Sequence, residues 1–156
     1  NVTISFTPDI RCCVFKKGET KLFNPVTDFI AMRKDIQENS KIIDLWGFML
    51  NVPTLLGGLY FADHLEGVAV ITSILVSLLI ATQIHKRTPL SRLMGLCHVV
   101  FIPTIILFAM QTGQTPLTMP FGIWSTYSLV LMSICVLIDA FDLYGYFVQG
   151  NRTYNT

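Results

Sequence analysis

The chain has 156 residues, 52% of them hydrophobic and only 13% charged, and its formal net charge is +1. Soluble domains are about one quarter charged, so this composition favours a membrane protein over an ordinary soluble one. The small net charge gives no basis for a nucleic-acid partner, and the length accommodates one membrane domain with a short appendage.

Residues 1–41 are more polar than the rest and are predicted to form a short cytoplasmic or interfacial region. Val2–Phe6 alternates apolar and polar residues, Pro8-Asp9 is a turn signal, and Arg11–Phe15 is suited to a returning strand. A β-hairpin is therefore expected here. Because an isolated hairpin is only marginally stable, it should rest on another surface.

An amphipathic helix is predicted to follow the hairpin, over Pro25–Glu38. Asn24 is a favourable N-cap, and proline suits the first helical position. The residues predicted near one face are Val26, Phe29, Ile30, Arg33 and Ile36. Such a stripe, flanked by basic residues, fits the cytoplasmic headgroup layer or, equally, the surface of a partner protein.

Four apolar stretches occupy nearly all of the remaining chain, and none of them contains a lysine or arginine. They are Ile42–Ala62, Gly67–Ile84, Leu93–Met110 and Phe121–Phe147. Each is close to the ~20 residues that a helix needs to cross the hydrocarbon core, whereas a soluble surface helix gives one face to water. Pro53 and Pro103 are expected to kink their spans. We therefore predict an all-α membrane protein in which residues 42–156 form a four-transmembrane-helix bundle.

The basic residues predict the orientation of these spans. Every lysine and arginine precedes the first span, follows the fourth, or lies in the joint between the second and third. The joints Asp63–Glu66 and Gln111–Pro120 carry neither residue type. The positive-inside rule then places both termini of this multi-pass protein in the cytoplasm.

Small and polar residues recur on one face of three spans, as they do where membrane helices pack closely. The second span carries a helix-packing stripe made of Ala69, Ser73, Ser77 and Ala81. The first span has Asp44, Gly47, Asn51, Thr54, Gly58 and Ala62, and the fourth has Ser128, Met132, Cys135, Asp139 and Asp142. We expect these faces to meet other helices, with a path for an ion or substrate as the alternative interpretation.

An intramembrane polar cluster of Asn51, His98, Asp139 and Asp142 is predicted from the depths of these residues. Asn51, His98 and Asp139 lie at depths that agree within one helical turn. Because an imidazole or carboxylate facing hydrocarbon is costly, His98 and Asp139 should point inward and share a hydrogen bond, with Asn51 nearby. Asp142 is expected to reach Arg92 or Lys86. Such a cluster can fix the order of the helices or relay protons.

The sequence shows no catalytic or metal-binding motif, so we predict neither an enzyme nor a metal site. The turn Asp63–Glu66 holds three possible ligands, but ligands this close in sequence seldom converge on one ion, and solvated side chains are expected. No cofactor is predicted, although His98 could be the axial ligand of a haem or of a chlorin magnesium. Cys97 and Cys135 are expected to act as small apolar residues, and Trp124 as an interfacial anchor.

Two segments in the third and fourth spans resemble a family pattern. Ser91–Pro103 resembles a Gly-Leu-x-His…Pro motif, and Ile138–Gly150 resembles an Asp-x-x-Asp…Tyr…Gly ending. Together they resemble small, uncharacterised bacterial four-span inner-membrane proteins, over residues 42–152. The resemblance implies the bacterial inner membrane as the location and brings no established activity. Where that pattern has a basic residue before the final tyrosine, this chain has Gly145.

Three functions stay open on the sequence. The first is a non-catalytic accessory or structural subunit of a larger membrane complex, which fits the small size, the packing stripes and the cytoplasmic appendage. The second is a small transporter, or an ion- or proton-conducting oligomer with the polar cluster along its path. The third is a haem or pigment carrier that uses His98. The expected partners are the lipid bilayer and either other membrane subunits or further copies of the chain.

Overall fold

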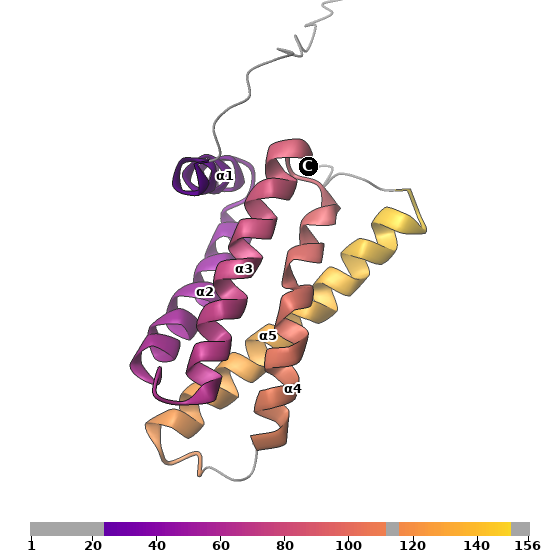
Figure 1. Cartoon of the computed structure of the whole chain (residues 1–156). Helices are drawn as coiled ribbons and strands as arrows, with labels where there is room; N and C mark the ends of the chain where they lie inside the picture. Colours follow the sequence, from indigo (N-terminus) through magenta and orange to yellow (C-terminus); the bar gives the residue numbers. More distant parts are fainter. Residues whose placement is uncertain (1–23, 112–115, 151–156) are drawn as a thin grey trace, which may run out of the picture.

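The computed structural model describes residues 24–111 and 116–150 of the chain. Within these ranges the protein is all-helical, with five α-helices and one 3₁₀ helix (Figure 1). In chain order they are α1 (Pro25–Asn39), α2 (Lys41–Tyr60), α3 (Leu65–Arg87), the 3₁₀ helix η1 (Arg92–Val100), α4 (Phe101–Gln111) and α5 (Pro120–Phe147). The β-hairpin predicted before Asn24 lies outside the described residues.

Helix α1 begins where the sequence predicted it. The Asn24 side chain accepts a hydrogen bond from the Thr27 N–H, and Pro25 occupies the start of the helix. Ser40 alone separates α1 from α2, and its side chain caps α2 by accepting from the Ile43 N–H. The chain therefore turns sharply, and α1 lies across the end at which α2 begins and α3 ends (Figure 1).

The packed face of α1 differs from the predicted stripe. Met32 is buried, and Phe29 and Ile36 pack beside it against residues of α3 and η1. Val26 and Ile30 are 65% and 61% exposed, so this part of the predicted stripe does not pack within the described part of the chain. Its prediction as a surface for the headgroup layer or for a partner protein stays a prediction. Phe29, Met32 and Ile36 follow the three- and four-residue spacing of one helix face, which centres the packed face on Met32.

Four helical segments are long and apolar enough to cross a membrane: α2, α3, η1 continued by α4, and α5. Each predicted bound lies within one helical turn of the observed one, so the four predicted spans are confirmed as candidate spans. Helix α2 contacts α3 and α5, and the third span contacts the same two helices. Figure 1 shows α2 and α3 side by side, with α5 crossing at an angle.

The third span departs from the single kinked helix that the sequence predicted. Its first part, η1, is a 3₁₀ helix of nine residues, and only the second part, α4, is α-helical. This is unusual because 3₁₀ runs rarely exceed three or four residues. Pro103 lies in the first turn of α4, where a backbone N–H has no partner within the helix. The α-helical part can therefore begin just before the proline.

Much of each predicted packing face lies in the interior, whereas Ala62 is exposed in the turn after α2. Ser73, Ser77 and Ala81 of the stripe on α3 are buried, and Ala69 is partly buried. Thr54 of α2 and Ser128 of α5 are completely buried. The main apolar cluster consists of Leu50, Val70, Ile74, Phe101, Phe108, Trp124, Met132 and Cys135.

Trp124 belongs to this core and is not the interfacial anchor that the sequence predicted. Its side chain is 8% exposed, and its indole N–H donates to the Thr54 carbonyl at 3.2 Å. Gly57 permits the approach, because a Cβ at that position would lie 2.0 Å from the indole. The prediction used the depth of Trp124 alone, and depth does not determine which side of a helix faces lipid.

Candidate functional site

Three side chains from the third and fourth spans meet inside the protein. His98 Nδ1 lies 2.6 Å from Asp139 Oδ2, and Cys135 Sγ lies 3.4 Å from that nitrogen and 3.7 Å from that oxygen. The side chains of His98 and Asp139 are 22% and 14% exposed, and Cys135 is buried. The imidazole also packs against the Phe101 ring, with the ring centroids 5.0 Å apart. We refer to His98, Cys135 and Asp139 as the polar triad.

The 3₁₀ geometry of η1 aligns the groups that face α5. With three residues per turn, residues three apart stack in a straight row, whereas in an α-helix they drift around the axis. Arg92, Gly95 and His98 form such a row. All three contact α5, through Asp142 and Asp139. The unusual helix type thus presents one cation, one close-packing site and one imidazole to the same neighbouring helix.

Two glycines allow the third and fourth spans to approach at this row. A Cβ at Gly95 would lie 3.0 Å from the Asp139 Cβ, and a Cβ at Gly145 would lie 2.7 Å from an Arg92 guanidinium nitrogen. Gly145 therefore makes room for Arg92, which pairs with Asp142 at 3.6 Å. A basic residue at 145, as in the resembled pattern, would compete for this space.

Asn51 satisfies its amide within its own helix. Its Nδ2 donates to the Gly47 carbonyl at 2.8 Å, a bond that polar side chains often make to the preceding turn of a helix. Of the three residues predicted to share one depth, the described hydrogen bonds therefore bring together His98 and Asp139 but not Asn51. Depth alone did not show that α2 turns this amide toward its own backbone.

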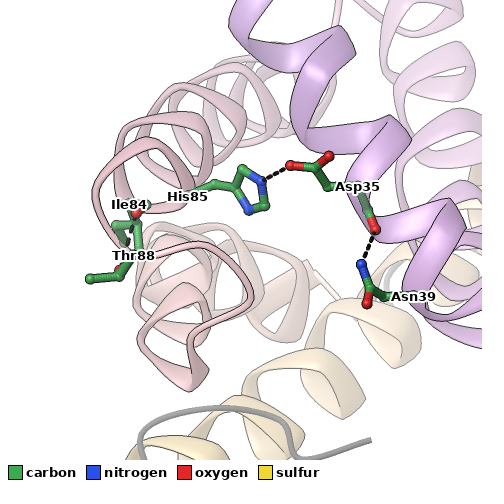
Figure 2. A network of polar contacts seen from close by, with 5 residues as sticks. All are labelled: Asp35, Asn39, Ile84, His85 and Thr88. Atoms are coloured by element: carbon green, nitrogen blue, oxygen red, sulfur yellow. Dashed lines mark hydrogen bonds and ion pairs between the residues drawn. The ribbon is translucent and has the colours of Figure 1, made fainter. Parts of the chain in front are cut away.

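A second polar site joins α1 to the end of α3 (Figure 2). His85 Nε2 lies 3.0 Å from Asp35 Oδ2, and the Asp35 carbonyl accepts a hydrogen bond from the Asn39 side chain at 2.8 Å. His85 is 6% exposed, and its Nδ1 has no hydrogen-bond partner among the described residues. Close by in sequence, Lys86 Nζ pairs with Asp28 at 2.9 Å. These contacts hold α1 against the ends of the spans.

The sequence spacing on α3 indicates that His85 is buried. His85 continues the stripe Ala69–Ala81 at the same four-residue spacing, so it falls on the packed face of α3. A polar side chain on such a face needs a partner from another element. Asp35 of α1 is that partner.

Glu66 corrects the prediction of a solvated turn at Asp63–Glu66. It is 3% exposed, and its Oε1 has no hydrogen-bond partner in the described part of the chain. Gly67 packs so closely on the preceding turn that a Cβ would lie 2.1 Å from the Phe61 carbonyl oxygen. Glu66 and Gly67 are therefore both buried in the first turn of α3.

The chain matches no protein-family model, no curated protein and no solved structure. The resemblance to bacterial four-span inner-membrane proteins therefore stays a prediction. The polar triad, the row on η1 and the α1–α3 junction are the features from which a function can be inferred.

Proposed function

We propose that the chain is a non-catalytic multi-pass membrane protein that serves as a small accessory or structural subunit of a larger membrane complex. The proposed location is the bacterial inner membrane, with both termini in the cytoplasm. Two observations together support this proposal. Apolar side chains fill the interior of the helices, and a large apolar surface on their outside is not covered by any other part of the described chain.

The interior on one side of the polar triad is filled by apolar side chains. Phe101 and Met132 are completely buried, and they pack in one cluster with Ile74 and Cys135. Met132 lies on α5 between Ser128 and Cys135, so apolar packing interrupts the row of polar groups on that face. Buried polar groups that hold helices together fit this arrangement better than a continuous conduction path.

The outer surface is apolar and mostly uncovered. Only 17% of the most apolar stretch of α2 is buried. Ile42, Leu56 and Leu59 of this helix are exposed, as are Val26 and Ile30 of α1. In a bilayer such side chains contact lipid or other transmembrane helices. We therefore propose lipid and other subunits, or further copies of this chain, as the partners.

The distribution of charge supports the proposed orientation. Lys86 and Arg33 make ion pairs at the end of the molecule where α1 lies. Arg92 follows the same joint between α3 and the third span and pairs near the end of α5. The helices therefore bring basic residues from separate parts of the chain to one end, which the positive-inside rule assigns to the cytoplasm.

Purification of the tagged chain from a bacterial membrane in a mild detergent tests the accessory role. We expect at least one different membrane protein to remain bound in a fixed ratio through size-exclusion chromatography, as measured by native mass spectrometry. A chain that elutes as a monomer or as a pure homo-oligomer at its native expression level would contradict this role.

Proton conduction by an oligomer is a second candidate, favoured by the short contact between His98 and Asp139. An imidazole paired with a carboxylate can hold and pass a proton. Liposomes containing the purified protein and a pH-sensitive dye test this candidate. A proton flux that Asp139→Asn abolishes and Asp63→Asn retains would support it, whereas absence of flux would reject it.

The third candidate, a haem or pigment carrier, rests on His98. Its Nδ1 faces Asp139, which leaves Nε2 as the ring nitrogen for an axial bond. A carboxylate on the other nitrogen is the usual support for a metal-bound histidine. Visible absorbance of the purified protein, lost in His98→Ala, would support this candidate.

A further inference from the structure

We propose that the polar triad is a binding site for a divalent transition-metal ion of the zinc class. His98 Nδ1, Cys135 Sγ and one carboxylate oxygen of Asp139 all lie within 4.8 Å of one another. Imidazole, thiolate and carboxylate are the three ligand types that zinc sites use. Metal binding at the triad is independent of the proposed accessory role.

The distances within the triad suit tetrahedral coordination. Bonds of ~2.0 Å to nitrogen and oxygen and ~2.3 Å to sulfur place a nitrogen and a sulfur ligand ~3.5 Å apart, and a nitrogen and an oxygen ligand ~3.3 Å apart. Cys135 Sγ already lies 3.4 Å from His98 Nδ1 and 3.7 Å from Asp139 Oδ2. The third distance of the triad, 2.6 Å between Nδ1 and Oδ2, is that of a hydrogen bond in the absence of an ion. It would lengthen by ~0.7 Å as an ion replaced the proton.

Metal binding at this site requires two protons to leave. One is the proton shared between His98 Nδ1 and Asp139 Oδ2, while Nε2 keeps its own proton, and the other is the thiol proton of Cys135. Both pass to solvent, which leaves a neutral imidazole, a thiolate and a carboxylate as ligands. Their summed charge of −2 neutralises a divalent cation, so the occupied site suits apolar surroundings better than three separate polar groups.

The surroundings restrict the site to a particular kind of ion. A thiolate and an imidazole select Zn²⁺ or Co²⁺ over Mg²⁺ and Ca²⁺, which prefer oxygen ligands. Cys97, which precedes His98 on η1, is also buried but does not belong to the group of ligand atoms that meet at the triad. Three ligands leave one tetrahedral position for water or for another donor.

Cobalt titration of the full chain tests the proposal. Cys12→Ser and Cys13→Ser are introduced first, because adjacent thiols could bind metal on their own. The protein is purified in a mild detergent, stripped with a chelator and titrated with Co²⁺. We expect one Co²⁺ per chain, with a thiolate-to-cobalt charge-transfer band in the near ultraviolet that one equivalent of Zn²⁺ removes.

Two variants locate the ion. Cys135→Ala should abolish the charge-transfer band and weaken Co²⁺ binding by more than the ~10–100-fold typical of losing an outer-shell group. The control variant His64→Gln removes an exposed imidazole at the N-cap of α3, outside the triad. It should bind Co²⁺ as the parent protein does. Addition of Zn²⁺ should raise the melting temperature of the parent but not of Cys135→Ala. A folded, monodisperse parent without the band, or a band that survives Cys135→Ala, would overturn the proposal.

Discussion

His98 and Asp139 depend on each other because each would otherwise be a costly polar group in an apolar helix interface. Their side chains are mostly buried, and the two atoms in contact are 2.6 Å apart. The sequence was sufficient to predict this pair, since an ionisable residue at membrane depth must find a partner at the same depth. It was not sufficient to include Cys135, because a thiol in a span is compatible with lipid, helix packing or a polar contact.

Removal of either His98 or Asp139 should lower the free energy of unfolding. Removal of both should lower it by less than the sum of the two single losses. His98→Ala or Asp139→Ala leaves the other side chain in contact with only the weakly polar Cys135 thiol, for which we expect a loss of ~3–5 kcal/mol in the free energy of unfolding. The double variant should show a coupling of ~0.5–3 kcal/mol. Equilibrium unfolding in mixed detergent micelles measures this free energy for the parent, the two single variants and the double variant. Additive losses would show that the two side chains do not interact.

Gly95 should be sensitive to a single added methyl group. Its Cβ would lie 3.0 Å from the Asp139 Cβ, so Gly95→Ala should push η1 from α5 and cost ~1–3 kcal/mol. Gly47→Ala on α2 is the matched control, because its Cβ would meet no atom within 4 Å. That control should be neutral or stabilise α2 by up to ~1 kcal/mol. Thermal unfolding of the two variants in the same detergent distinguishes a local clash from a general effect of alanine.

At the scale of the elements, η1 explains why the third and fourth spans meet as they do. The straight row Arg92, Gly95 and His98 exists because η1 has three residues per turn. Hydrophobic periodicity predicted an apolar helix here but not its type, because the apolar residues run all around the span. In α1, by contrast, the cap at Asn24 and the start at Pro25 were predictable from local chemistry, as both depend on neighbouring residues alone.

The packed face of α3 gives a prediction at the same scale. Ser77 is 2% exposed at the centre of the stripe, so Ser77→Leu should overpack the interface and cost ~1–3 kcal/mol. Thr72 lies on the exposed side of the same helix, and Thr72→Leu should be tolerated in detergent and in lipid. Unfolding of both variants in mixed micelles measures the difference. Equal losses would show that the stripe does not face other helices.

At the scale of the whole molecule, the sequence predicted the number of spans better than the sides they present. Composition and the positions of basic residues determine how the chain partitions between water and lipid. These two features therefore identified all four candidate spans. The burial of Glu66 and Trp124 depends instead on how helices rotate against one another. That rotation is set by close contacts such as those at Gly57 and Gly67, which no single segment reveals.

The arrangement of four spans with the basic end in the cytoplasm is tested most directly by cysteine labelling from one side of the membrane. Single cysteines are placed in the Cys12→Ser, Cys13→Ser background at two exposed positions, Asp63 between α2 and α3 and Pro89 between α3 and η1. A membrane-impermeant thiol reagent added to intact spheroplasts should label Asp63→Cys, and it should reach Pro89→Cys only after the membrane is opened. Labelling of Pro89→Cys in intact spheroplasts, or of both positions from the same side, would contradict the proposed topology.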